Sequence, residues 1–188
     1  MAGSVERRQG EFRTRIVRAL VALLVGMVMV LPFSQYIVDW LAKPVTKLNY
    51  ELVFTAPAEA FWVRMKAGLI VGIFLSAPVI LWQVWALVAP GLRRIHGKKY
   101  ALPFVVIGSA FFIGGGAFSL FVVTPYAMQF LLSYTRPGLM PMITLPDHVD
   151  FMLKFALAFG VVFELPLALT ILASLGIVNS KMLAHSRR

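Results

Sequence analysis

The chain has 188 residues, of which 60% are hydrophobic and 14% are charged, and its mean hydropathy is +0.82. This composition is far more apolar than that of a soluble domain and indicates a protein with several membrane spans. The formal net charge is +10, but the basic residues gather beside apolar segments, as membrane topology requires, and do not indicate a nucleic-acid partner. Cysteine is absent, which excludes disulfides and thiolate metal sites.

Four apolar windows are long enough to cross a bilayer, at residues 16–38, 67–90, 100–123 and 155–178. About 20 apolar residues at a rise of 1.5 Å per residue span the roughly 30 Å hydrocarbon layer. A helix satisfies its own backbone polar groups in lipid, and these windows lack the alternating pattern of a membrane barrel. The sequence therefore predicts an all-α membrane protein, with four transmembrane helices in a single membrane domain of residues 1–188.

The positions of the basic residues predict the orientation of these helices. Five arginines lie before or at the start of the first window, four basic residues lie at 93–99 between the second and third, and three lie at 181–188 after the fourth. Four crossings place these three segments on one side. By the positive-inside bias, the N-terminus, the short basic loop and the C-terminus are expected in the cytoplasm. A basic rim there also suits anionic lipid headgroups.

Prolines and glycines mark the expected breaks and close approaches. Pro44 is expected to break the first helix, because proline lacks the N–H donor and clashes with the preceding turn. Pro57 suits the first position of the next helix. Pro78 should kink the second span, and Pro166 should disturb the fourth. The glycines at 114–116 should let a neighbouring helix approach the third span closely.

Glu164 is an acidic residue near the middle of the fourth window. An acidic side chain at the bilayer centre costs on the order of 3 kcal/mol, so it requires neutralisation, a polar partner or a wet cavity. If the site is dry, we expect the carboxyl to be protonated. Two interpretations stay open: an internal hydrogen bond that packs the helices, or a functional contact with another membrane protein or with substrate. Gln83 is the other strongly polar side chain within the spans.

Signs of catalysis are few. His96, His148 and His185 lie scattered outside the spans, so the sequence predicts no metal site and no cofactor. The spans contain no protease dyad, paired aspartate or metal-binding motif, and we expect no enzyme. A proton-coupled secondary transporter would also place an acid such as Glu164 at the midplane, although no inverted repeat is visible. That function is kept as the alternative.

Several blocks resemble, in the same order, the TatC family, the integral subunit of the twin-arginine protein translocase. The resemblance covers nearly the whole chain. The blocks are EFRTR at 11–15, FTAPAEAF at 54–61, LSAPVILWQVWALVAPGL at 75–92, FVVTPYAMQFLLSY at 121–134 and FALAFGVVFELP at 155–166.

The resemblance implies a multi-pass inner-membrane receptor with no bond-making chemistry. Family members bind the twin-arginine signal peptides of folded cargo at the cytoplasmic face. They assemble as homo-oligomers with small single-span partners of the TatA and TatB type, and the proton gradient drives export. The signal-binding positions it implies are Glu11, Arg13, Arg15, Leu87 and Leu92, with Glu164 and Gln83 as the intramembrane polar site. A helical i,i+4 pair between Glu11 and Arg15 is an alternative role for both.

Two features depart from the family pattern. The first cytoplasmic loop usually supplies a second glutamate for the signal's arginines, whereas GLRRIHGKKYALP has His96 and Gly97 near that place and no carboxylate. A lone Glu11 amid basic neighbours should hold an arginine pair less well. The family also has six spans, and this sequence ends at HSRR. We expect the four spans to be the first four of a six-helix fold, in a fragment of a longer protein.

Overall fold

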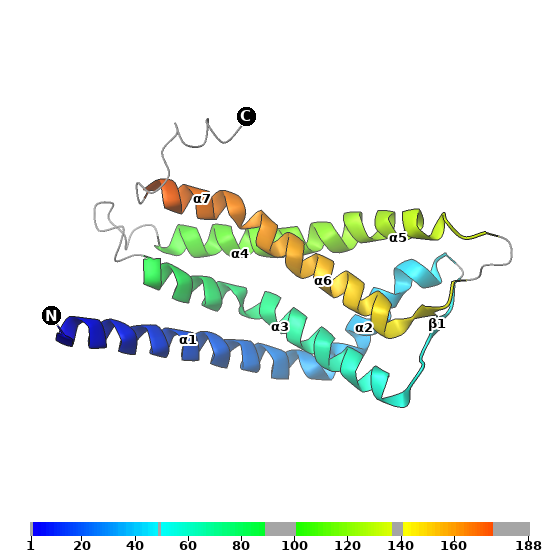
Figure 1. The fold of residues 1–188 in the computed structure, drawn as a ribbon, viewed down its shortest axis with the longest axis horizontal. Helices are drawn as coiled ribbons and strands as arrows, with labels where there is room; N and C mark the ends of the chain where they lie inside the picture. The colour runs from blue at the N-terminus through cyan, green and yellow to red at the C-terminus, as the bar shows by residue number, and fades with distance from the viewer. Residues whose placement is uncertain (1, 49, 89–100, 137–140, 175–188) are drawn as a thin grey trace.

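The computed structural model describes residues 2–48, 50–88, 101–136 and 141–174, with only the backbone described for 2–9, Glu11, Val88, Leu172 and Ser174. Figure 1 shows long helices that run side by side along one axis. The elements in chain order are α1 (Ala2–Val30), the 3₁₀-helix η1 (Leu31–Phe33), α2 (Ser34–Thr46), β1 (Leu52–Val53), α3 (Pro57–Val88), α4 (Ala101–Phe118), the π-helix η3 (Ser119–Val123), α5 (Thr124–Leu132), β2 (Ile143–Thr144), α6 (Leu145–Phe163) and α7 (Leu165–Ser174).

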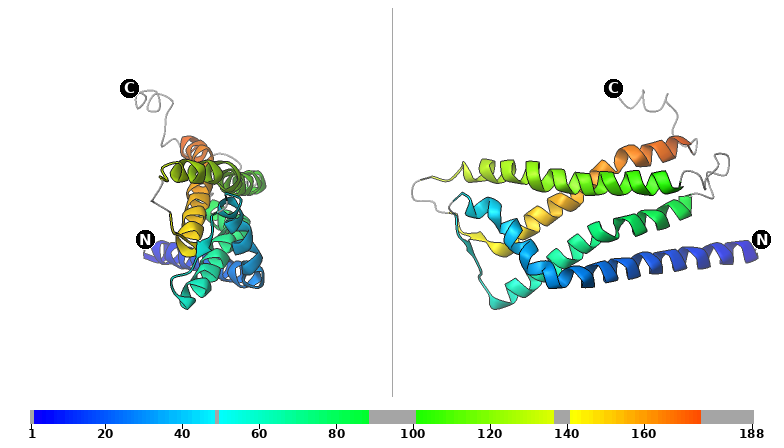
Figure 2. Two further views of the ribbon diagram at one scale, coloured as in Figure 1. Left: turned by 90° about the vertical axis from the view of Figure 1, so that its right-hand side faces the viewer. Right: turned by 180° about the vertical axis from the view of Figure 1, so that it is seen from behind.

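The predicted all-α membrane fold is confirmed. Four helical segments in the described residues are long and apolar enough to cross a membrane, and they span Phe12–Thr46, Pro57–Leu87, Ala101–Leu132 and Leu145–Ile171. Seen from behind in Figure 2, α1 lies along α3, and α4 lies beyond α3. We call the end where α1 begins and α3 ends the N-terminal end, and the opposite end, where β1 and β2 lie, the strand end.

The fourth span begins earlier than its hydropathy predicts. Helix α6 starts at Leu145, ten residues before the expected start at 155. The hydroxyl of Thr144 caps the helix by accepting a hydrogen bond from the Asp147 N–H at 3.3 Å. The charged residues of this first part lower the local hydropathy, yet its apolar side chains face the core, and the amphipathic turns continue directly into the span.

Only some of the prolines begin or interrupt a helix where the sequence predicts it. Pro57 begins α3, and Pro166 lies at the start of α7, just after the helix break, as predicted. The break predicted at Pro44 is misplaced, because α2 continues through it to Thr46. The first helix changes its winding earlier, in the η1 turn that holds Pro32. Pro78 lies inside α3, which remains helical on both sides.

Glycines allow the helices to meet backbone against backbone. A Cβ built on Gly72 of α3 would lie 2.7 Å from the Met27 nitrogen of α1, and one on Gly26 would lie 2.9 Å from the Gly72 oxygen. The predicted close approach at the triple glycine is confirmed at Gly115, whose Cβ would lie 2.6 Å from the Phe159 oxygen of α6. Small residues at such crossings are typical of membrane helices.

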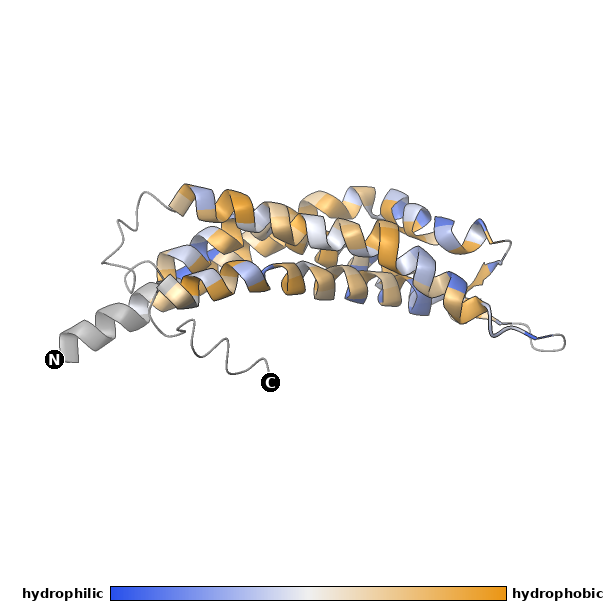
Figure 3. Ribbon diagram, turned by 90° about the horizontal axis from the view of Figure 1, so that it is seen from above, coloured by the Kyte–Doolittle hydropathy of each residue, from blue (hydrophilic) through white to orange (hydrophobic). Residues whose placement is uncertain are grey.

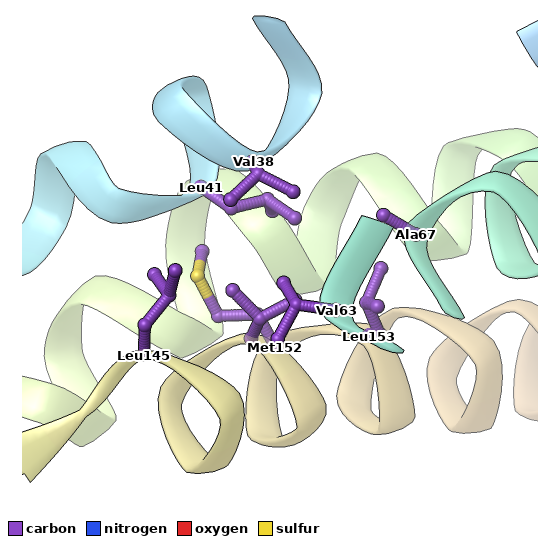
Figure 4. Packing of buried hydrophobic residues seen from close by; sticks show 8 residues of the cluster. Val38, Leu41, Val63, Ala67, Leu145, Met152 and Leu153 are labelled. Carbon is purple, nitrogen blue, oxygen red and sulfur yellow. The ribbon is translucent and has the colours of Figure 1, made fainter. Parts of the chain in front are cut away.

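The largest buried cluster joins α2, α3 and α6 at the strand end, where Leu41 is 1% exposed and Met152 is 1% exposed (Figure 4). Strands β1 and β2 pair in parallel beside it, with Leu52 opposite Ile143. The Lys66 ammonium contacts the Asp150 carboxylate at 2.8 Å and ties α3 to α6. The strand end is therefore held by packing, by backbone pairing and by one ion pair between helices.

Hydrophobic residues, coloured orange in Figure 3, predominate along the helices, and many of the large ones are exposed. Helix α1 carries large apolar side chains that are about half exposed or more, among them Leu20, Leu24 and Val28. In water such a surface would drive aggregation, whereas in hydrocarbon it costs nothing. The bundle therefore has the surface of a multi-pass membrane protein.

Candidate functional site

Glu164 lies at the junction between α6 and α7. Its N–H donates to the Val161 oxygen at 3.1 Å, and its own carbonyl accepts from the Ala168 N–H at 2.9 Å. Pro166 has no N–H to donate back into α6, which explains why the helix is interrupted here. The predicted break thus places the acidic residue at a joint between two helices.

The Glu164 carboxyl points into the bundle. Its Oε1 atom is buried and has no hydrogen-bond partner among the described residues. A Cβ built on Gly108 of α4 would lie 3.5 Å from this oxygen, 3.1 Å from Leu81 Cδ1 and 3.0 Å from Leu167 Cδ2. Gly108 therefore provides the space that the carboxyl occupies. A buried polar atom left without a partner costs about 1–3 kcal/mol and calls for an explanation, of which function is one.

Gln83 does not share this site. It lines a cavity of about 540 Å³ between α1 and α3 at the N-terminal end, together with Gly10, Thr14, Arg15, Arg18, Trp82 and Ala86. The two polar residues that the sequence singled out thus belong to separate places. Sequence reasoning missed Arg18 and Trp82, although Arg18 lies one turn after Arg15 and Trp82 adjoins Gln83.

The α1–α3 cavity, defined by the residues just listed, carries unpaired positive charge. Arg15 is half-buried and Arg18 is exposed, and neither forms an ion pair within the described part of the chain. The side chain of Glu11 lies outside the described part of the chain, so its alternative pairing with Arg15 stays a prediction. Glu11 belongs to α1 one turn before Arg15, which puts both residues on the same side of the helix.

The remaining predicted signal-binding residues lie near this cavity or outside the described part of the chain. Leu87 is 39% exposed and follows the cavity residue Ala86 at the end of α3. Arg13 is exposed but does not line the cavity. Leu92, His96 and Gly97 lie outside the described residues.

His148 has a structural role, because it joins two packed helices. Its Nε2 lies 2.9 Å from the Leu41 carbonyl oxygen. Because that oxygen can only accept hydrogen bonds, Nε2 is the donor. The contact joins α6 to α2 inside the buried cluster at the strand end. Within residues 2–48, 50–88, 101–136 and 141–174, no three histidines or carboxylates gather in a way that could hold a metal ion.

Comparison with known proteins places the chain in a family. The model of the family described as "Sec-independent protein translocase protein (TatC)" matches residues 10–188. The TatC protein of Carboxydothermus hydrogenoformans is 36% identical to this chain, over 94% of this chain and 72% of the relative. That of Desulforapulum autotrophicum is 37% identical, over 95% of this chain and 67% of the relative.

The fold agrees with this relationship. A crystal structure described as the twin-arginine translocase receptor TatC superposes with a TM-score of 0.88 at 31% identity, and the match covers 96% of this chain and 81% of the crystallised one. The sequence relatives are translocase components, which are transport proteins and not enzymes. The chain therefore belongs to the TatC family of Sec-independent protein translocase proteins.

Proposed function

We propose that this translocase component is the receptor that binds twin-arginine signal peptides at the N-terminal end of its helix bundle. The observation that carries the proposal is the α1–α3 cavity, which is polar, about 540 Å³ in volume and one helical turn from Glu11. This volume falls in the range of ligand pockets, roughly 300–1,000 Å³. An opening of this size can admit an extended peptide segment.

The chemistry of the cavity suits a peptide with two arginines. The signal's guanidiniums would bind the Glu11 carboxylate through charge-assisted hydrogen bonds. Arg15 and Arg18 of the receptor would repel those guanidiniums, but their N–H groups can donate to the peptide's backbone carbonyls. Gln83 can both donate and accept, and Leu87, with Leu92, offers apolar contact to the residues that follow the arginines. Arg13 is exposed on the same helix and would face the remainder of the signal.

The role of Glu11 can be tested by photocrosslinking of a twin-arginine peptide to membranes that contain the chain. Glu11→Gln should lower the crosslinking yield about tenfold, because a hydrogen bond to a charged group contributes about 1.5–3 kcal/mol. His96→Glu, which restores a second carboxylate, should raise the yield. Higher salt should weaken binding that depends on charge pairing at a solvent-accessible site.

Glu51→Gln is the matched control, because Glu51 is an exposed acid at the strand end. It should leave crosslinking of the signal peptide unchanged. Unchanged crosslinking in both Glu11→Gln and His96→Glu would refute the receptor role of the carboxylate, whereas the family membership and the fold would stand.

The proposed orientation places the N-terminal end in the cytoplasm. The motivation is the arginine-rich start of α1, including Arg13, Arg15 and Arg18. In intact cells, an impermeant thiol reagent added outside should label Met142→Cys, whose side chain is 81% exposed at the strand end. It should not label Gly10→Cys, where a Cβ meets nothing within 4 Å. The reverse labelling pattern would contradict the orientation.

We further propose that the chain docks small single-span partners of the TatA and TatB type through Glu164, in a homo-oligomeric receptor complex that uses the proton gradient for export. The support is the buried Glu164 Oε1 atom without a partner. A polar side chain on a partner helix could supply the missing hydrogen bond. Residues beside Glu164, such as Val161 and Leu165, are each 54% exposed and open to such a helix.

A further inference from the structure

A second cavity lies at the strand end, away from the α1–α3 cavity and from Glu164. It has a volume of about 320 Å³ and is bounded by α2, by η3 with α5, and by α6. Its lining includes Trp40, Lys43, Lys47, Phe121, Gln129 and Met152. We call it the strand-end cavity. Nothing in the proposed receptor function makes use of it.

The strand-end cavity is amphipathic. Met152, which is 1% exposed, belongs to the buried cluster and forms an apolar floor. Lys43 and Lys47 are one turn apart on α2, both are exposed, and neither forms an ion pair within the described residues. Gln129 adds a neutral polar group from α5. Two free ammonium groups over an apolar floor match a ligand with an anionic head and an apolar body.

The surroundings of the cavity belong to the membrane interface. The Trp40 and Phe121 rings meet edge to face, with centroids 5.4 Å apart. Phe121 is 67% exposed, Tyr126 70% and Tyr36 74%. Exposed aromatic side chains at the end of membrane helices mark the level of the lipid headgroups. The mouth of the cavity therefore opens where a headgroup and the first part of its acyl chains lie.

One wall of the cavity is formed by an irregular helical segment. Leu120 and Phe121 belong to the π-helix η3, and π-helical turns are frequent at functional sites. Ser119 and Thr124, which flank the lining segment, are both 0% exposed, and their hydroxyl oxygens have no hydrogen-bond partner among the described residues. The segment thus carries buried polar groups beside the cavity.

We propose that the strand-end cavity binds the phosphate headgroup of an anionic phospholipid, with Lys43 and Lys47 as its cationic contacts. Ammonium groups bind phosphate as point charges, and each lysine near an anionic lipid surface strengthens binding by about fivefold. Neither lysine pairs with an acid among the described residues, which leaves both charges available to a ligand. A zwitterionic lipid presents its own cation and should bind less well.

The test uses the chain purified in detergent, with phosphatidylglycerol, phosphatidylcholine and soluble glycerol 3-phosphate as probes. Native mass spectrometry counts the bound lipid, and thermal unfolding reports its effect on stability. Phosphatidylglycerol should bind and raise the melting temperature, and the other two probes should do so far less. In the double variant Lys43→Gln, Lys47→Gln the affinity for phosphatidylglycerol should fall about 25-fold.

Two further variants make the result specific. Arg64→Gln removes an exposed cation of α3 that does not line the cavity, and it should bind the lipid like the parent. The double variant Lys43→Arg, Lys47→Arg keeps both charges and should retain binding. An equal response to phosphatidylglycerol in the glutamine variant would overturn the proposal. An equal response of the parent to glycerol 3-phosphate would also overturn it, because the ligand would then be a soluble anion.

Discussion

Glu164→Leu should abolish crosslinking between this chain and its small single-span partners, whereas Glu164→Gln should retain much of it. A protonated carboxyl at membrane depth both donates and accepts hydrogen bonds, and an amide does the same at a similar size. Leucine removes both abilities. The measurement is photocrosslinking from a reactive residue at Leu165, which neighbours Glu164 and is 54% exposed.

The two variants also separate the interpretations that the sequence left open. Immunoblots must first show that parent and variants accumulate equally in the membrane. If Glu164→Leu crosslinks as well as the parent, Glu164 is an internal packing group that fills the space beside Gly108. If Glu164→Gln fails as completely as Glu164→Leu, ionisation is essential, and the account based on a neutral hydrogen bond is wrong.

Gly115→Ala should destabilise the bundle by about 1–3 kcal/mol, the usual cost of overpacking. Its new Cβ would lie 2.6 Å from the Phe159 oxygen and 2.9 Å from Phe163 Cβ, so α4 and α6 would have to separate. A backbone carbonyl cannot rotate out of the way as a flexible side chain can. The measurement is the fraction of protein that remains monodisperse in detergent after heating.

The adjacent Gly114 is the matched control. A Cβ built there meets nothing within 4 Å, and the residue is exposed. Gly114→Ala should therefore leave stability unchanged or raise it by up to about 1 kcal/mol, because alanine favours the helix over glycine. Equal losses in the two variants would show that the close crossing of α4 and α6 does not determine stability.

The helices of this fold could be predicted from hydropathy because lipid imposes a simple rule: the spanning backbone must be helical and its side chains apolar. The ends of the helices could not be predicted in this way. The start of α6 carries charged residues that lower its hydropathy, and one of them, Asp150, pairs with Lys66 of α3, which is distant in the sequence. The parallel pairing of β1 with β2 also joins segments that are distant in the sequence, and no short sequence pattern in either strand indicates it.

The candidate sites could be predicted in part. Glu164 and Gln83 stood out because polar side chains are rare in such spans, but their separation depends on how α3 faces its two neighbours. Gln83 faces α1, and Leu81 of the same helix lies near Gly108 beside the Glu164 carboxyl. The space at Gly108 that receives this carboxyl also comes from the packing of three helices. Sequence spacing along one helix does not determine which neighbour it meets.

The most direct measurement of the proposed receptor function is photocrosslinking from inside the α1–α3 cavity. A photoreactive residue at Gln83 should crosslink a twin-arginine signal peptide and should crosslink a twin-lysine version much less, because lysine cannot form the paired hydrogen bonds of a guanidinium. The same group at Tyr126, which is 70% exposed on α5 and does not line this cavity, should crosslink neither peptide. Equal crosslinking of both peptides from position 83, or crosslinking from position 126 alone, would contradict the account.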